Sequence, residues 1–177
     1  MSDVITIRDK TFKPYITQQK ITEAVTKVAV KINNDFKQEV PLFLVVLNGS
    51  FMFAADLLRE ITIPCELSFV KLASYHGTES GEVKELIGIG ESVRGRTVIV
   101  VEDIVDTGNT IDVLYTQLKK MEVAGVFVAS AFLKPTVYNK EYPIEYRGLE
   151  IEDKFVIGYG LDYLGFGRNL KDLYVLE

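Results

Sequence analysis

The sequence lacks the features that define several large classes of protein. Cys65 is the only cysteine, which excludes an internal disulfide and any metal site that needs several cysteines. The longest uninterrupted apolar run, Leu42 to Leu47, is far too short to cross a bilayer. The first residues, MSDVITIRDK, contain no basic segment followed by an apolar one, as an export signal would. We therefore expect a protein of the reducing cytoplasm that has no membrane partner.

Positive charge is also scarce. The chain has 20 Lys and Arg residues against 25 Asp and Glu residues, which gives a formal net charge of −5. Binding to nucleic acid normally needs a concentrated basic face, so we expect no nucleic-acid partner. A small anionic ligand is compatible with this charge if a few cations are placed close to it.

Two common nucleotide-binding motifs are missing as well. The sequence contains no G-x-x-x-x-G-K-[ST]. The segments GIGESV (88–93) and GYGLDY (158–163) both lack the third glycine of G-x-G-x-x-G. A site for a nucleotide or its precursor would have to be built from other residues.

The chain does contain an ordinary globular composition, with 47% apolar and 25% charged residues. At this length roughly 70% of the surface of the unfolded chain can be buried, so one domain is expected. Short β-branched apolar runs alternate with amphipathic segments, and no linker or internal repeat interrupts them. The sequence predicts a single α/β domain over residues 1–177, with a mostly parallel central sheet flanked by helices.

The individual elements are predicted from apolar periodicity and capping residues. A long helix is expected to begin after Thr17 and to reach Phe36, and a second helix over 51–60 is expected to be capped by Ser50. A third helix would place on one side Ile111, Leu114, Tyr115, Leu118 and Met121. The predicted strands cover residues 42–47, 66–72, 97–101, 126–133 and 154–160.

The segment VVEDIVDTGNT (100–110) is the strongest candidate for a site. A predicted strand ends in Glu102 and Asp103, at the edge of a parallel sheet where ligands bind. The turn that follows contains Asp106, Thr107, Gly108, Asn109 and Thr110. Its N–H groups and hydroxyls, at the start of a helix, suit a phosphate. The acid pair would repel a phosphate and suits vicinal hydroxyls or a metal ion instead. A ribose 5′-phosphate satisfies both halves. Each half alone is better explained by solvated acids and an Asx-type helix cap, but the combination within eleven consecutive residues favours the site.

The same segment resembles the signature of the type I phosphoribosyltransferases, which bind 5-phosphoribosyl-1-pyrophosphate. Four more segments resemble, in order and spacing, those of the hypoxanthine-guanine branch of this family. They are VLNGSFMFAADLLR (46–59), KLASYHGTESGEVK (71–84), FLKP (132–135) and DKFVIGYGLDY…R (153–168). The resemblance covers nearly all of the chain from about residue 40 onward.

The resemblance implies an enzyme of purine salvage that uses Mg2+. It would transfer the 5-phosphoribosyl group to N9 of hypoxanthine or guanine and release pyrophosphate. It also implies a homodimer or homotetramer. A small hood built from N-terminal and C-terminal segments would cover the site, and a mobile flap would lie at about 73–85.

Roles for single residues follow from the resemblance. The acids Glu102 and Asp103 would hold the ribose hydroxyls, the turn 106–110 would hold the 5′-phosphate, and Asp106 would be the general base facing N7 of the purine. The remaining assignments are Asn48, Gly49 and Arg168 for pyrophosphate, Lys134, Phe155 and Val156 for the purine, Ser74 and Tyr75 for the flap, and Glu102, Asp103 and Asp162 for the metal. Many relatives have Lys where this chain has Asn48.

Two other functions are compatible with the phosphoribosyl motif. A regulator that senses phosphoribosyl pyrophosphate would usually carry a helix-turn-helix domain or a basic face, and neither is evident in this sequence. A plain nucleotide-binding module would have no reason to combine the flap with Lys134. The sequence therefore favours the enzyme.

Overall fold

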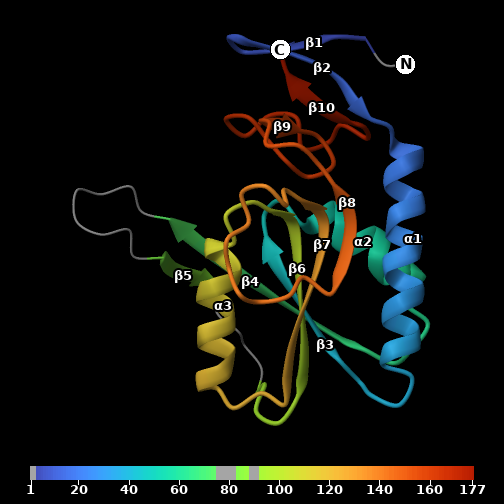
Figure 1. Ribbon diagram of the computed structural model, residues 1–177, viewed down its shortest axis with the longest axis vertical. Helices are drawn as coiled ribbons and strands as arrows, with labels where there is room; N and C mark the ends of the chain where they lie inside the picture. The colour runs from blue at the N-terminus through green and yellow to red at the C-terminus, as the bar shows by residue number, and fades with distance from the viewer. Residues whose placement is uncertain (1–2, 75–82, 88–91) are drawn as a thin grey trace.

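A six-stranded sheet with helices on both faces forms the larger part of the structure, which is a computed structural model describing residues 3–74, 83–87 and 92–177. Its strand order is β5-β4-β3-β6-β7-β8 (Figure 1). The strands are β3 (Leu42–Leu47), β4 (Glu66–Ser74), β5 (Val83–Ile87), β6 (Thr97–Val105), β7 (Gly125–Leu133) and β8 (Tyr146–Glu150). Neighbours pair in parallel, except that β5 is antiparallel to β4. This arrangement confirms the predicted α/β fold with a mostly parallel sheet.

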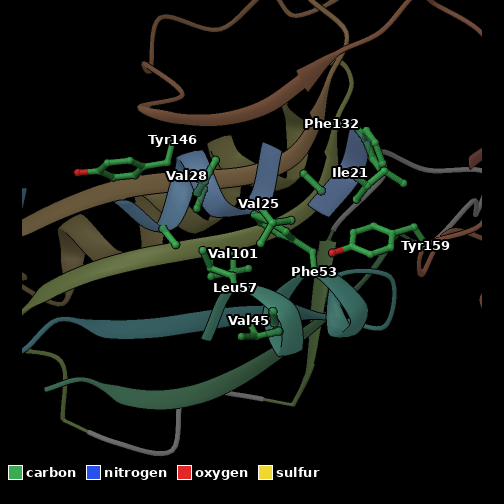
Figure 2. Packing of buried hydrophobic residues seen from close by; sticks show 14 of the residues in the cluster. Ile21, Val25, Val28, Val45, Phe53, Leu57, Val101, Phe132, Tyr146 and Tyr159 are labelled. Carbon is green, nitrogen blue, oxygen red and sulfur yellow. The ribbon is translucent and has the colours of Figure 1, made fainter. Parts of the chain in front are cut away.

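Three helices cover the two faces of this sheet. They are α1 (Gln18–Asp35), α2 (Phe51–Glu60) and α3 (Asn109–Lys120). The predicted cap of α1 is confirmed, since the Thr17 side chain accepts a hydrogen bond from the N–H of Lys20 at 3.5 Å. Figure 2 shows Val25 and Val28 of α1 packed with Phe53 and Leu57 of α2 in the cluster on one face.

The central strands are apolar throughout because both of their faces are buried. In β3, Phe43 and Val45 belong to the cluster under α1 and α2, whereas Leu42 and Leu44 belong to the cluster under α3. Alternate residues of a strand point to opposite faces, so a strand covered by helices on both sides needs apolar residues at every position. The apolar run at 42–47 is therefore continuous because both faces of β3 are covered.

A second, four-stranded antiparallel sheet joins the two ends of the chain. Its strand order is β1-β2-β10-β9. The strands are β1 (Ile5–Ile7), β2 (Lys10–Ile16), β9 (Val156–Ile157) and β10 (Leu173–Leu176). Figure 1 shows this sheet stacked beyond one end of the main sheet, with the chain around β9 between the two. Within the described residues, no helix is long and apolar enough to span a membrane.

Several elements differ from those predicted. The strand expected over 154–160 is reduced to Val156–Ile157 and lies in the small sheet. It stops because Gly158, Tyr159 and Gly160 all have positive φ angles, of 99°, 48° and 97°. The sequence does not predict the strands β1, β2, β5, β8 and β10, because their apolar runs are short or are interrupted by polar residues.

Two predicted helix residues also behave differently. The hydroxyl of the buried Ser50 makes no cap on α2 and donates instead to the carbonyl of Val46. Ser50 itself has a helical backbone conformation, which points its side chain away from the free N–H groups. Met121 is the C-cap residue of α3 and is 38% exposed, so it does not extend the buried side of that helix.

Two valines two positions apart on α1 test how far the buried side of this helix stabilises the fold. Val28 is 3% exposed, whereas Val30 is 54% exposed. We expect Val28→Ala to lower the free energy of unfolding by about 2 kcal/mol, because two methyl groups and their contacts are lost from a packed core. Val30→Ala is the matched control and should change it by less than about 0.5 kcal/mol. Urea unfolding measures both, and equal losses would contradict the assigned burial.

Candidate active site

The site begins where β6 ends, at the carboxyl edge of the main sheet. The strand runs through both acids to Val105, and α3 starts only four residues later at Asn109. Gly108 is the N-cap residue of α3 and has a φ of 84°, a left-handed conformation that glycine adopts without strain. A cavity of about 90 Å³ opens over this turn and is lined by Glu102 and residues 104–111. The turn predicted from the sequence is therefore present as a concave site at a helix N-terminus.

Glu102 and Asp103 form a pair of neighbouring acids that is largely shielded from water. Glu102 is 7% exposed, and its Oε2 atom has no hydrogen-bond partner among the described residues. Burial raises the pKa of Glu102 well above its usual range, and the negative charge of Asp103 raises it further. Burial also raises the pKa of Asp103, although hydrogen bonds from Glu102 and from the N–H of Ile104 oppose this. One of the two acids thus tends to keep a proton in the free protein.

Two glycines allow three distant segments to meet around Asp103. A Cβ atom on Gly49 would lie 1.4 Å from Oδ2 of Asp103, so any side chain there would displace the carboxylate. A Cβ atom on Gly160 would lie 1.9 Å from the carbonyl oxygen of Gly49. The peptide bond between Leu47 and Asn48, just before Gly49, is cis. The loop after β3, the end of β6 and the turn after β9 are therefore in direct contact.

Arg168 brings a positive charge to this junction. It donates a hydrogen bond to the carbonyl of Gly160 at 2.7 Å and pairs with Asp162 at 2.6 Å. The charge of Arg168 also acts on Asp103, where it favours the ionised carboxylate. Asp162 is further held by the N–H of Gly165, which donates to it at 2.6 Å. Asp162 is thus held by Arg168 and by the turn that contains it. It lies far along the sequence from Glu102 and Asp103.

Lys134 follows the last residue of the neighbouring strand β7 and is almost fully covered. Its N–H donates to the carbonyl of Val105 at 2.9 Å, which ties the end of β7 to the end of β6. The ammonium pairs with Asp106 at 3.0 Å and with Asp153 at 3.1 Å. Burial lowers the pKa of Lys134, but the two carboxylates outweigh this and the net shift is upward. Lys134 is therefore held as a cation against the turn at 106–110, the candidate phosphate turn.

The sequence alone does not identify Asp153 as a site residue. It opens the DKF segment two residues before Phe155, and only the structure shows that it meets Lys134 across 19 positions of sequence. In the sequence it is only an acid next to a candidate purine-binding segment. Acids are common in exposed loops of any protein, so this one could not be selected from the sequence.

Phe155 is 45% exposed and so is not a core residue. Its ring meets Tyr163 edge-on with centroids 5.9 Å apart, and the ammonium of Lys10 lies 5.5 Å from its centroid. The next residue, Val156, is buried and pairs with Val175 of β10. The small sheet thus presents an aromatic ring while it anchors the residue that follows.

The remaining predicted site residues are Asn48, Ser74 and Tyr75. Asn48 is exposed in the loop that contains the cis peptide bond. Ser74 is the last residue of β4, where its backbone pairs with Val83 of β5. Tyr75 and the sole histidine, His76, to which we assign no role, lie outside the described residues, as does most of the flap predicted at about 73–85. No group of three or more metal-ligating side chains comes together in the parts of the chain that are described.

The β6 acid pair, the phosphate turn and the surrounding cations on a parallel sheet are the arrangement expected of a phosphoribosyltransferase. Comparison with known proteins agrees, because the phosphoribosyl transferase domain matches residues 15–164. The hypoxanthine-guanine phosphoribosyltransferase of Streptococcus pneumoniae is 35% identical over 167 residues, which cover 93% of each chain. The chain belongs to the phosphoribosyltransferase family, and similar proteins of Streptococcus pneumoniae and Streptococcus agalactiae are hypoxanthine-guanine enzymes.

Solved structures show the same likeness in three dimensions. A hypoxanthine-guanine phosphoribosyltransferase of Bacillus anthracis has a TM-score of 0.88 at 33% identity, covering 93% of this chain and 98% of that one. A Trypanosoma cruzi hypoxanthine phosphoribosyl transferase, studied for the role of its C-terminal region in oligomeric state and activity, has a TM-score of 0.87 at 32% identity. That comparison covers 98% of this chain and 95% of the other.

The buried acid pair makes the stability of the free protein depend on pH. Because the pKa of Glu102 is raised on folding, its favourable contribution is complete below its unfolded pKa and is lost as the pH rises through its folded pKa. Glu102→Gln replaces it with a neutral side chain of similar shape. We expect the variant to unfold with a higher free energy than the wild type at about pH 8 and to lose this advantage toward about pH 5.

Urea unfolding at a series of pH values, without ligands, measures this difference. The exposed Glu60→Gln is the matched control and should follow the wild-type curve. A gap between Glu102→Gln and the wild type that does not change with pH would contradict the raised pKa.

Proposed function

We propose that this protein is a hypoxanthine-guanine phosphoribosyltransferase of purine salvage. It would transfer the 5-phosphoribosyl group of 5-phosphoribosyl-1-pyrophosphate to N9 of hypoxanthine or guanine, giving IMP or GMP and pyrophosphate. The observation that carries the proposal is the contact between Lys134 and Asp106 at 3.0 Å, directly beside the phosphate turn. It puts a candidate base-recognition group and a candidate proton acceptor within reach of one ligand. The named relatives support the same reaction.

The 5′-phosphate would bind in the turn at residues 106–110. In that position it would meet the N–H groups at the start of α3 and the hydroxyls of Thr107 and Thr110. A helix N-terminus carries a partial positive charge, and its first N–H groups lack partners within the helix. Both properties favour a bound phosphate.

The ribose hydroxyls would meet Glu102 and Asp103. The Oε2 atom of Glu102 is buried without a partner among the described residues, and a buried carboxylate oxygen of this kind is costly until a donor or a cation satisfies it.

Mg2+ is usually held by one or two carboxylates together with substrate oxygens and water, so it does not need the cluster of three protein ligands that the described residues lack. When bound, Mg2+ supplies neutralisation of charge on the pyrophosphate. Glu102, Asp103 and Asp162 are its candidate protein contacts.

Pyrophosphate would leave toward Arg168 and the loop at 47–50. The guanidinium of Arg168 is a fixed fork of donors that matches phosphate oxygens. Asn48 and Gly49 would add donors from the loop backbone. Because Asn48 is uncharged, Arg168 has a larger share of the neutralisation here than in relatives that carry Lys at this position.

Lys134 suits recognition of a 6-oxo purine. Its ammonium has three N–H donors, and among the described residues Asp106 and Asp153 account for two of them, which leaves one for O6 of the base. A 6-amino group would confront this donor with another donor. Phe155 would stack on the face of the purine, and the backbone of Val156 would contact its edge.

Bond formation at C1 of the ribose would pass through an oxocarbenium-like state, as in glycosyl transfer generally. The protein would mainly position the two substrates and keep charges balanced around them. Asp106 would accept the proton of the purine at N7, on the side of the base next to Lys134. Closure of the flap that includes Ser74 and Tyr75 would keep water from the reacting carbon.

We also propose the hood, the oligomeric state and the cellular location of the enzyme. The small sheet of β1, β2, β9 and β10 would act as the hood over the site, within a single domain. We propose a homodimer or homotetramer, supported by the Trypanosoma cruzi relative that was studied for its oligomeric state. A cytoplasmic location is consistent with a single exposed cysteine, Cys65. A purely regulatory role is less favoured, because the relatives named above are enzymes.

The proposed function is tested with a panel of purine bases. Purified protein with phosphoribosyl pyrophosphate and magnesium should convert hypoxanthine and guanine to nucleotides, with at least about 100-fold lower kcat/KM on adenine, since the wrong 6-substituent leaves buried polar groups unpaired. Xanthine completes the ranking. No turnover of any base by protein that binds phosphoribosyl pyrophosphate would favour the regulatory role instead.

Asp106 and Asp153 both pair with Lys134, so replacing each in turn distinguishes proton transfer from purine binding. We expect Asp106→Asn to lower kcat by about 100-fold or more, the range for a positioned proton-transfer group. Asp153→Asn is the matched control, because it also removes one charge from Lys134 and should act mainly on the KM for the purine. Steady-state kinetics for both substrates measure the two effects. If both variants lowered kcat equally, Asp106 would have no special role in proton transfer.

A further inference from the structure

The segment that follows Lys134 runs alongside the phosphate turn and the first turns of α3. At one end Lys134 pairs with Asp106, and at the other end Tyr142 stacks on Tyr115 of α3 with ring centroids 4.0 Å apart. The segment turns sharply at its start, since the N–H of Tyr138 donates to the carbonyl of Lys134 at 3.1 Å. Residues 134–142 are thus tied both to the turn and to the helix.

Between these two ends the segment packs directly on Gly108. A Cβ atom on Gly108 would lie 2.5 Å from the ring of Tyr138 and 2.8 Å from Cγ of Lys140. The ring and the apolar stem of Lys140 therefore cover the back of the phosphate turn. The ammonium of Lys140 ends 3.4 Å from Oδ2 of Asp112, on α3.

Asp112 presents a problem for an anionic ligand. The turn and the first residues of α3, from 106 to 112, include two acids and no cation. The N–H of Asp112 donates to the carbonyl of Gly108 at 2.9 Å, so Asp112 lies one helical turn beyond the N-cap. Helical side chains tilt toward the N-terminus, which directs this carboxylate back toward the turn. A phosphate dianion bound there would be opposed by that charge.

The same segment supplies a lysine to each of the two acids. Lys134 meets Asp106 and Lys140 meets Asp112, and in both pairs the partners are 28 positions apart in sequence. We propose that Lys140 is a positioning residue for the 5′-phosphate, which neutralises Asp112 and supports Gly108 from behind. This inference rests on the proposed function to the extent that it takes the ligand of the turn to be a 5-phosphoribosyl compound.

If Lys140 only stabilised the fold, its replacement would have a different effect. With a side chain that is 23% exposed and an ion pair of 3.4 Å, it would add only a small amount to stability. Its replacement would then shift the melting temperature slightly and leave ligand binding unchanged. A positioning role requires a selective effect on the phosphorylated substrate, and this effect separates the two.

Lys140→Met keeps the apolar stem on Gly108 and removes the charge. We expect its KM for phosphoribosyl pyrophosphate to rise about 5-fold, the size of effect that one uncompensated charge produces near a helix terminus. Both kcat and the KM for the purine should change by less than about 2-fold. Lys140→Arg, which keeps the charge, should stay close to the wild type.

The role of Asp112 is tested by combining the variants. Adding Asp112→Asn to Lys140→Met should return the KM for phosphoribosyl pyrophosphate close to that of the wild type, because the acid that Lys140 neutralised is then also gone. Lys120→Met, at the exposed far end of α3, removes the same net charge and serves as the control. An unchanged KM in Lys140→Met, or an undiminished loss in the double variant, would overturn the inference.

Binding of ribose 5-phosphate, measured by calorimetry, keeps this test separate from the proposed reaction. It needs no turnover, and Lys140→Met should weaken it by the same factor as it raises the KM. If the wild type bound ribose 5-phosphate but converted no purine, the proposed reaction would be wrong, and the loss in Lys140→Met would still support the role of Lys140.

Discussion

Two adjacent carboxylates at the end of β6, with Glu102 buried and Asp103 partly buried, constrain the rest of the site. A buried acid pair is unfavourable in the free protein unless a proton, a donor or a cation compensates it. The structure brings these compensations from two parts of the chain, with Arg168 acting on Asp103 and the N–H of Ile104, within β6, donating to it. Glu102 keeps one oxygen without a partner among the described residues. The free protein is therefore arranged for an occupant that carries donors or positive charge.

Backbone proximity makes this arrangement possible. Gly49 and Gly160 have no side chains, and each lets another segment approach to a distance that a Cβ atom would forbid. The acids, the cis-peptide loop and Arg168 can consequently act on a single small ligand. Around the neighbouring turn, long lysine side chains reach across from the segment after β7 and pair with the acids there. Close backbone contact on one side and long cationic side chains on the other form the two walls of the site.

The sequence was informative wherever the signal is local. The buried strands at 42–47 and 126–133 could be recognised because burial on both faces fixes residue types at consecutive positions, and the segment 100–110 because a proposed phosphate would do the same. Contacts between segments that are distant along the chain do not fix residue types at consecutive positions, so the sequence does not show them. The pairing of Lys134 with Asp153, the cover on Gly108 and the edge strand β8 all depend on how the chain returns to itself. Ser50 shows the same limit, since its hydroxyl is taken by the preceding strand.

The small sheet has a consequence for the order in which the molecule is assembled. Its strand β10 (Leu173–Leu176) lies between β2 and β9, so neither of these can complete its pairing before residue 176 has been synthesised. The last strand of the main sheet ends at Glu150, so its strands can pair earlier on the ribosome, since nascent chains emerge at about 5–20 residues per second. The hairpin of β1 and β2, made first, would wait for the last strand. The aromatic ring of Phe155 would thus be fixed in place only after the phosphate turn already exists.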